Sequence, residues 1–240
     1  MSSHPTAGAF DSERLAKQVP PIALRYLRHA IRPGATLARR AEITFHGFVR
    51  LKPRFPWLPF RGHEIIEAGQ SFHVRARASL GPLSVTTHDR YEQGMATAQL
   101  RLFGLIPVMN RHGPDLARST RGRFIVESTW LPSSFLPELG ASWSEEGDLA
   151  LLTMPIENEE VKVRMRLESD GLLRELRLQR WSDLTDEGRY AWVPFAAHTE
   201  EERTFGDYTV PSRLHASWWP GTDREFEFFR AVVDTIHYSL

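Results

Sequence analysis

The chain has 240 residues, a length at which one all-β domain is common, and we expect a single domain over 1–240. Its 30 basic and 30 acidic side chains cancel, which argues against a nucleic-acid partner. The absence of cysteine excludes a disulfide scaffold, a thiolate zinc site and a cysteine nucleophile. Because the sequence has no apolar run of about 18 residues and its start lacks the apolar core of a signal peptide, we expect a cytoplasmic protein without a transmembrane segment.

The N-terminal part is predicted to be helical after a disordered start. Residues 1–10 are small and polar, and we expect them to be disordered. Asp11 can cap a short helix that runs through Lys17. A second helix is predicted to begin at Pro21 and to end at Pro33, because apolar residues recur between them at helical spacing.

From residue 37 onward the hydrophobic period changes to two, the spacing of half-buried β-strands. In 161–168 we expect one set to be buried and the other exposed: Val161, Val163, Met165 and Leu167 against Lys162, Arg164 and Arg166. Glycine-containing turn signals between such runs indicate hairpins. The predicted strands cover 37–52, 60–68, 71–80, 83–92, 94–103, 141–155, 159–168, 171–181, 190–205, 207–219 and 223–238.

Residues 114–130 break this alternation. We predict one helix or two short helices there, weakened at Gly122, and then a proline-bounded loop over 131–137. Because a long antiparallel sheet twists and curls, the sequence predicts a mainly β (α+β) fold. Its core would be one curved antiparallel sheet or half-barrel that wraps an N-terminal helix pair and the mid-chain helix.

Aromatic residues are numerous, with seven Trp and fourteen Phe in the chain. They cluster at 55–60, 130–135, 181–192, 218–219 and 226–229. These rings either fill the core or line a pocket for an apolar ligand on the concave face of the sheet. Trp57 and Phe60 lie where prolines predict a surface loop, which favours a ligand-binding role for both.

One group of candidate site residues lies on the predicted mid-chain helix. Arg123, Glu127 and Trp130 have the spacing of one helical face. A carboxylate beside a guanidinium and an indole can act as a general base or anchor a ligand, but it is also typical of a structural ion pair. Glu127 is therefore a candidate catalytic residue, and Arg123 and Trp130 are candidate ligand-binding residues.

A second group lies on the predicted strand 83–92. Asp89 and Tyr91 share its more apolar face, while His88 lies on the other. A carboxylate on an apolar face needs a partner, so the two residues form either a structural Asp–Tyr pair or part of a site. Asp89 and Tyr91 are candidate catalytic residues, and His88 is a candidate ligand-binding residue.

No metal or cofactor is predicted. His198, Glu200 and Glu202 share a strand face and could hold a divalent cation, but carboxylates at this spacing are typical of a solvated strand. The group of His63, Glu64 and Glu67 is not distinguishable from chance. Neither a glycine-rich nucleotide motif nor a GxSxG motif occurs, which leaves nucleotide cofactors and serine-based acyl transfer without support.

Short motifs follow one another along most of the chain: Pro20-Pro21 with Arg25-Tyr26-Leu27, Trp57 to Phe60, Asp89 to Gly94, Leu102 to Val108, Gly113 to Leu116, Arg123 to Glu127, Trp130 to Pro132, Phe205 to Tyr208, Val210-Pro211 and Trp218. Their order resembles an uncharacterised bacterial domain family of unknown function whose fold is related to the lipoprotein-carrier (LolA/LolB-like) half-barrels. The resemblance implies a curved antiparallel sheet that wraps helices, and it implies no reaction. The sequence departs from the family pattern at 133–134 and in the acidic run 200–202.

Three functions are compatible with these features. The first is the binding of an apolar or amphipathic small molecule in an aromatic-lined cavity, with Arg123, Glu127 and the Asp89–Tyr91 pair orienting its polar end. The second is a cofactor-independent hydrolase, isomerase or lyase that uses Glu127 or Asp89 as general acid or base. The third is a protein-interaction module built on exposed Trp and Phe loops. A catalytic carboxylate should have its pKa raised by burial, and an anchoring one should have it lowered by its arginine.

Overall fold

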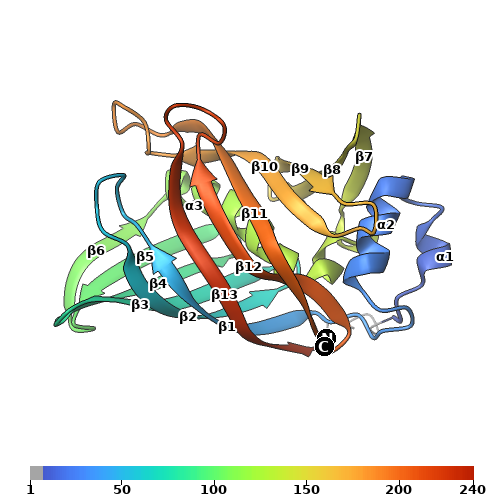
Figure 1. Cartoon of the computed structure of the whole chain (residues 1–240), viewed down its shortest axis with the longest axis horizontal. Coiled ribbons are helices and arrows are strands. Elements are labelled where there is room, and N and C mark those ends of the chain that lie inside the picture. Colours follow the sequence, from blue (N-terminus) through green and yellow to red (C-terminus); the bar gives the residue numbers. More distant parts are fainter. Residues whose placement is uncertain (1–7) are drawn as a thin grey trace.

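The computed structural model describes residues 8–240, in which thirteen strands form one antiparallel sheet (Figure 1). The strand order is β6-β5-β4-β3-β2-β1-β13-β12-β11-β10-β9-β8-β7. Strands that pair in the sheet are therefore consecutive in the sequence, except for β1, which pairs with β13. The sheet consists of two meanders that are joined along β1 and β13, and the predicted class of one curved antiparallel sheet with few helices is confirmed.

The first meander contains β1 (Arg40–Val49), β2 (Leu58–Glu67), β3 (Ser71–Leu80), β4 (Leu83–Glu92), β5 (Met95–Leu102) and β6 (Ile106–His112). The second contains β7 (Ser142–Glu146), β8 (Leu149–Ile156), β9 (Glu159–Leu167), β10 (Leu173–Ser182), β11 (Ala191–Phe205), β12 (Tyr208–Trp218) and β13 (Phe226–Ser239). The helix α3 (Pro114–Glu127) and three short 3-10 turns between 128 and 139 connect the two meanders.

Residue alternation determines which face of each strand is buried. In β9, Val163 and Met165 are buried, and Val161 and Leu167 are half-buried. The three basic residues between them are exposed, as predicted. The opposite register would place these guanidinium and ammonium groups in the core without partners, so the pattern allows one register only.

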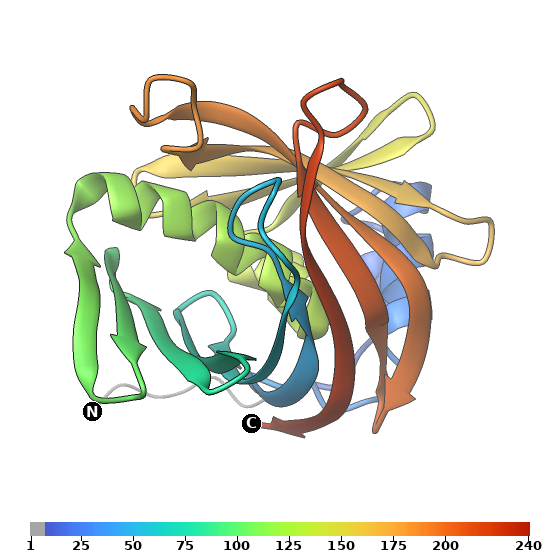
Figure 2. The same cartoon turned by 60° about the vertical axis from the view of Figure 1, so that its left-hand side comes forward.

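The helices cover different parts of the sheet. The short helix α1 (Ser12–Leu15) is capped by the Asp11 carboxylate, which accepts the backbone N–H groups of Glu13 and Arg14. The helix α2 (Pro21–Ala30) contacts β7, β8 and β12 through its buried apolar face. The helix α3 lies across the hollow of the curled sheet, where it contacts β4–β6 on one side and β9–β10 on the other (Figure 2).

Polar contacts hold the sheet in its curled shape. Arg111 on the edge strand β6 donates a hydrogen bond of 2.8 Å to Asp183, which follows β10. The indole N–H of Trp181 on β10 donates to Asp115 at the start of α3, also at 2.8 Å. The first bond joins the free end of the first meander to the second, and the other joins the start of α3 to β10, so the hollow between the meanders is bounded on both sides.

The prediction of disorder for residues 1–10 is wrong for the part that the structure describes. Phe10 is buried, and its backbone N–H donates to the carbonyl oxygen of Ala35 at 2.8 Å. Ala9 forms an isolated antiparallel bridge with Thr36. Residues 1–7 lie outside the described residues. The buried phenyl ring of Phe10 explains the difference, since it packs into the core from an otherwise polar segment.

Two strand predictions need correction. The predicted strand 141–155 is the hairpin β7–β8, because Gly147 adopts the positive φ that a tight turn requires. The strand β6 was not predicted at all. Six of its seven residues are exposed, so it shows no buried alternation that a sequence pattern could reveal.

No helix in the described part of the chain has the length and apolarity needed to cross a bilayer.

Candidate functional site

A cavity of about 610 Å³ lies in the hollow between the curled sheet and α3. Strands of both meanders and the C-terminal half of α3 line it, and most of the lining side chains are aliphatic or aromatic. Leu51 and Val108 border the cavity and are 57% and 60% exposed, so the cavity reaches solvent beside the β1–β2 loop and β6. The sheet and α3 thus enclose a mainly apolar cavity that is open to solvent at one end.

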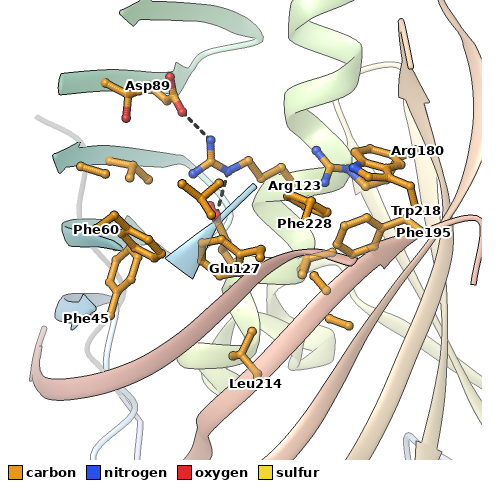
Figure 3. Close-up of a pocket in the computed structure, with 18 of the residues that line it drawn as sticks. Phe45, Phe60, Asp89, Arg123, Glu127, Arg180, Phe195, Leu214, Trp218 and Phe228 are labelled. Atoms are coloured by element: carbon orange, nitrogen blue, oxygen red, sulfur yellow. Dashed lines mark hydrogen bonds and ion pairs between the residues drawn. The ribbon is translucent and has the colours of Figure 1, made fainter. Parts of the chain in front are cut away.

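A polar cluster centred on Arg123 interrupts the apolar wall. Arg123 extends from α3 between two carboxylates, as Figure 3 shows. Its Nε donates to Glu127 Oε1 at 2.7 Å, and its Nη1 donates to Asp89 Oδ2 at 2.5 Å. Burial alone lowers the pKa of Arg123, but the carboxylates of Glu127 and Asp89 outweigh burial and raise it above its ordinary value. The guanidinium is therefore charged, and both carboxylates that border the cavity bind to it.

A third carboxyl group, Glu64, lies behind this cluster. It is inward-facing on β2 and fully buried, and it shares a row of the sheet with Val74 on β3 and Asp89 on β4. Neither of its oxygens has a hydrogen-bond partner among the described residues when the group is ionised, and the same is true of Glu127 Oε2. Burial raises the pKa of Glu64 well above its ordinary value, and the charge of Glu127 raises it further. The buried position beside Glu127 therefore favours the protonated, uncharged form of Glu64.

Arg180 on β10 is the other charged group at the cavity. Its side chain is buried, and its guanidinium lies 4.8 Å from the ring centre of Phe195 and 4.9 Å from that of Trp218. The stem of Arg180 passes close to Gly122 of α3, where a Cβ atom would lie 3.2 Å from Arg180 Cγ. The glycine that weakens the middle of the helix thus leaves room for this side chain.

The model of a family of unknown function (DUF6544) matches residues 8–231. The chain belongs to this family. None of the curated proteins matches it in sequence. The prediction that the chain belongs to an uncharacterised family is confirmed.

Three solved structures are similar to this DUF6544 chain, each at 8% sequence identity. A putative outer membrane lipoprotein-sorting protein domain from Vibrio parahaemolyticus covers 95% of this chain and 93% of its own, with a TM-score of 0.46. A DUF1329 family protein from Desulfovibrio piger covers 91% of each chain at a TM-score of 0.49. A LolA superfamily protein from Nitrosomonas europaea covers 90% of each at 0.45. Nothing about a ligand follows from likeness at this level.

The cavity brings five of the predicted site residues together. Arg123, Glu127 and Asp89 form the polar cluster, and Trp130 and Phe60 contribute aromatic wall. Trp130 lies in the 3-10 turn Ser128–Trp130 that continues α3, and its indole N–H donates to the carbonyl oxygen of Pro211 at 2.9 Å. The helical spacing therefore identified one wall of the cavity, and it stays a prediction that these residues contact a ligand.

The other three predicted residues lie away from the cavity. Tyr91 is inward-facing but packs against Phe72 and Phe124, with ring centres 6.4 and 5.7 Å away. Burial raises the pKa of the Tyr91 hydroxyl. The expected Asp–Tyr pair is not formed in the described structure, because Asp89 binds Arg123 instead.

His88 and Trp57 are separated from the cavity in different ways. His88 lies on the face of β4 opposite to Asp89, across from Arg75 on β3. Trp57 lies at the end of the β1–β2 loop, where the guanidinium groups of Arg50 and Arg230 cover its ring at 4.7 and 4.6 Å. Neither side chain borders the cavity.

The three residues considered for a metal do not converge. Irregular pairing on both sides of Glu201 disturbs the register along β11. Glu200 contacts His215 at 3.0 Å, Glu202 contacts His29 at 2.5 Å, and His198 stacks on His215. Residues 8–240 contain no group of three or more His, Cys, Asp or Glu residues placed to hold a metal ion.

Sequence reasoning missed Glu64 and Arg180. Each occupies an inward position of a strand, and the inward neighbours two residues away include Ile66 for Glu64 and Leu178 for Arg180. A charged residue at an inward position of an alternating strand is the signal that could have identified both.

Proposed function

We propose that the protein binds an apolar or amphipathic small molecule in the cavity between the sheet and α3. The observation that supports this most is the cavity itself, which is large, mainly apolar and open to solvent at one end. Protein interiors are close-packed, and voids larger than a water molecule are few. A volume of about 610 Å³ lies in the range of small-molecule sites and is far larger than a packing defect.

The walls indicate how such a ligand would be oriented. Apolar side chains from both meanders surround most of the space, while Asp89, Arg123 and Glu127 occupy one side. Small-molecule sites commonly combine an apolar lining with a few polar groups that fix orientation. An amphipathic ligand would place its polar end at a charged part of the wall and its apolar part against the apolar remainder.

The alternatives have weaker support. A general acid would have to reach the ligand, but Glu64, whose pKa is raised, does not border the cavity, and Arg123 holds one oxygen of Glu127. A protein-interaction module needs an exposed flat patch rather than a cavity. A cytoplasmic location, which was expected from the sequence, stays a prediction.

The experiment fills the cavity and measures the binding of a neutral apolar dye. Ala76 on β3 borders the cavity, whereas Ser79 on the same strand lies on the opposite face. Nile red fluorescence should rise on titration with the wild-type protein. Ala76→Trp should weaken binding by about tenfold or more, since the indole would occupy the space of the dye.

Ser79→Trp is the matched control, because it adds an indole of the same size outside the cavity. It should bind Nile red as the wild type does, and circular dichroism melts should show that both variants fold. Equal dye binding by Ala76→Trp and the wild type, or no binding by the wild type, would contradict the proposal.

A further inference from the structure

The buried side chain of Arg180 forms no ion pair with any residue that the structure describes. Only 8% of the residue is exposed, and its Nε has no hydrogen-bond partner among the described residues. The two carboxylates that border the cavity, Asp89 and Glu127, both bind Arg123 instead. A buried charge without a partner is strongly destabilising, so natural proteins seldom keep one without a reason.

The rest of the cavity does not supply the missing charge. Burial and, after it, repulsion by Arg123 lower the pKa of Arg180 to about 9, against a smaller opposing effect of Glu127. The third carboxyl group, Glu64, does not border the cavity, and burial and Glu127 raise its pKa. At neutral pH the guanidinium is therefore charged and faces the cavity without a counter-ion within residues 8–240.

Three neighbours hold this guanidinium in place. The rings of Phe195 and Trp218 pack against it, and Gly122 makes room for its stem. Contact with aromatic faces uses the π-surface of a guanidinium and leaves its N–H edge available. That edge matches the two oxygens of a carboxylate or phosphate. In Figure 3 the Arg180 side chain lies beside both rings, and no dashed line reaches it.

We infer that the ligand is an anionic amphiphile, whose carboxylate or phosphate group binds Arg180 and whose apolar chain occupies the rest of the cavity. This inference rests on the proposed function and narrows it to a class of ligand. Phe195 and Trp218 adjoin Arg180, and Leu176, Leu214 and Phe228 also line the cavity. A chain attached to the bound head group would lie against these side chains, with no polar group to desolvate.

The test compares head groups on one chain length. Dodecanoate, dodecyl phosphate, dodecanol and dodecylamine would compete with Nile red at pH 7.4, below their micelle-forming concentrations. At least one anion should displace the dye at concentrations about tenfold or more below those of dodecanol, and dodecylamine should be weakest. Acetate and inorganic phosphate carry the same charged groups without a chain and should not compete.

Arg180→Met removes the charge and keeps an apolar stem. It should abolish the preference for anions over dodecanol while Nile red still binds. Arg177→Met is the matched control, because Arg177 lies on the same strand with its side chain 48% exposed, and it should keep the preference. Without ligand, Arg180→Met should melt at the wild-type temperature or higher, since it removes a buried unpaired charge. A purely structural arginine would give a lower melting temperature.

The outcomes separate this inference from the proposed function. If Nile red and all four amphiphiles fail to bind, both are wrong. If the amphiphiles bind without a preference for the anions, or if Arg180→Met keeps the preference, the cavity binds apolar molecules but Arg180 is not the anion site. Competition by acetate or inorganic phosphate as strong as that of the long-chain anions would show a site for free anions and would also overturn the inference.

Discussion

Replacing Glu64 by glutamine should remove a cost to folding that grows with pH. The carboxyl group is fully buried beside Glu127, and burial followed by the charge of Glu127 raises its pKa. A neutral Glu64 can donate a hydrogen bond to Glu127, whereas an ionised one would place two carboxylates together without solvent. Glutamine keeps the shape and a hydrogen-bond donor, but it has no proton to lose.

The sign and size of the effect follow from linkage between proton binding and folding. Because the pKa of Glu64 is raised in the folded state, its contribution to the free energy of unfolding is largest at pH values below its ordinary pKa of 4.5. That contribution is lost as the pH rises toward the folded-state pKa. Within this window the free energy of unfolding of the wild type should fall by about 1.4 kcal/mol per pH unit relative to the glutamine variant.

Urea unfolding measured between about pH 5 and pH 8 would test this difference in slope. Glu67→Gln is the control, because Glu67 lies on the same strand with its side chain 43% exposed. It should change stability by a small amount that does not depend on pH. If the curves of Glu64→Gln and the wild type stay parallel over this range, Glu64 is not a buried neutral acid and the description of the cluster is wrong.

Two further predictions concern the cluster and the sheet. In Glu127→Gln, Arg123 keeps its bond to Asp89, so the melting temperature should stay within a few degrees of the wild type. Nile red binding by this variant should weaken. A clearly lower melting temperature with unchanged binding would mean that the ion pair of Arg123 and Glu127 is a structural feature only. Gly47→Ala should lower the free energy of unfolding by about 3 kcal/mol or more in a urea titration, because a Cβ at Gly47 would lie 1.9 Å from the carbonyl oxygen of Arg230. A change below about 1 kcal/mol would mean that β1 and β13 separate easily at this point.

The sequence was sufficient to predict the fold class because most strands are buried on one face. Alternation identified β9 and the register of its side chains, and the break in alternation identified α3. The edge strand β6 could not be identified in this way, because most of its residues are exposed on both faces. The β7–β8 hairpin was read as one strand, since the turn at Gly147 interrupts a run of otherwise strand-like residues.

The candidate site was predictable only where local spacing determines it. Arg123 and Glu127 are four residues apart on one helix, so their ion pair follows from helical geometry. The partnership of Arg123 with Asp89 depends on how far the sheet curls around α3, which no local pattern encodes. Tyr91 shares the inward face with Asp89, but it packs into the core because Phe72 and Phe124 lie beside it.

The two arginines at the cavity differ in a way that stability alone does not explain. Arg123 has two carboxylate partners and is compensated. Arg180 has a buried Nε without a partner in the described part of the chain, and its stem occupies space left by Gly122, a residue that itself weakens α3. An apolar side chain on β10 would remove the first cost, and a smaller one there would also leave room for alanine on the helix. Two local losses of stability at the same contact are expected where a side chain is retained because it binds a ligand.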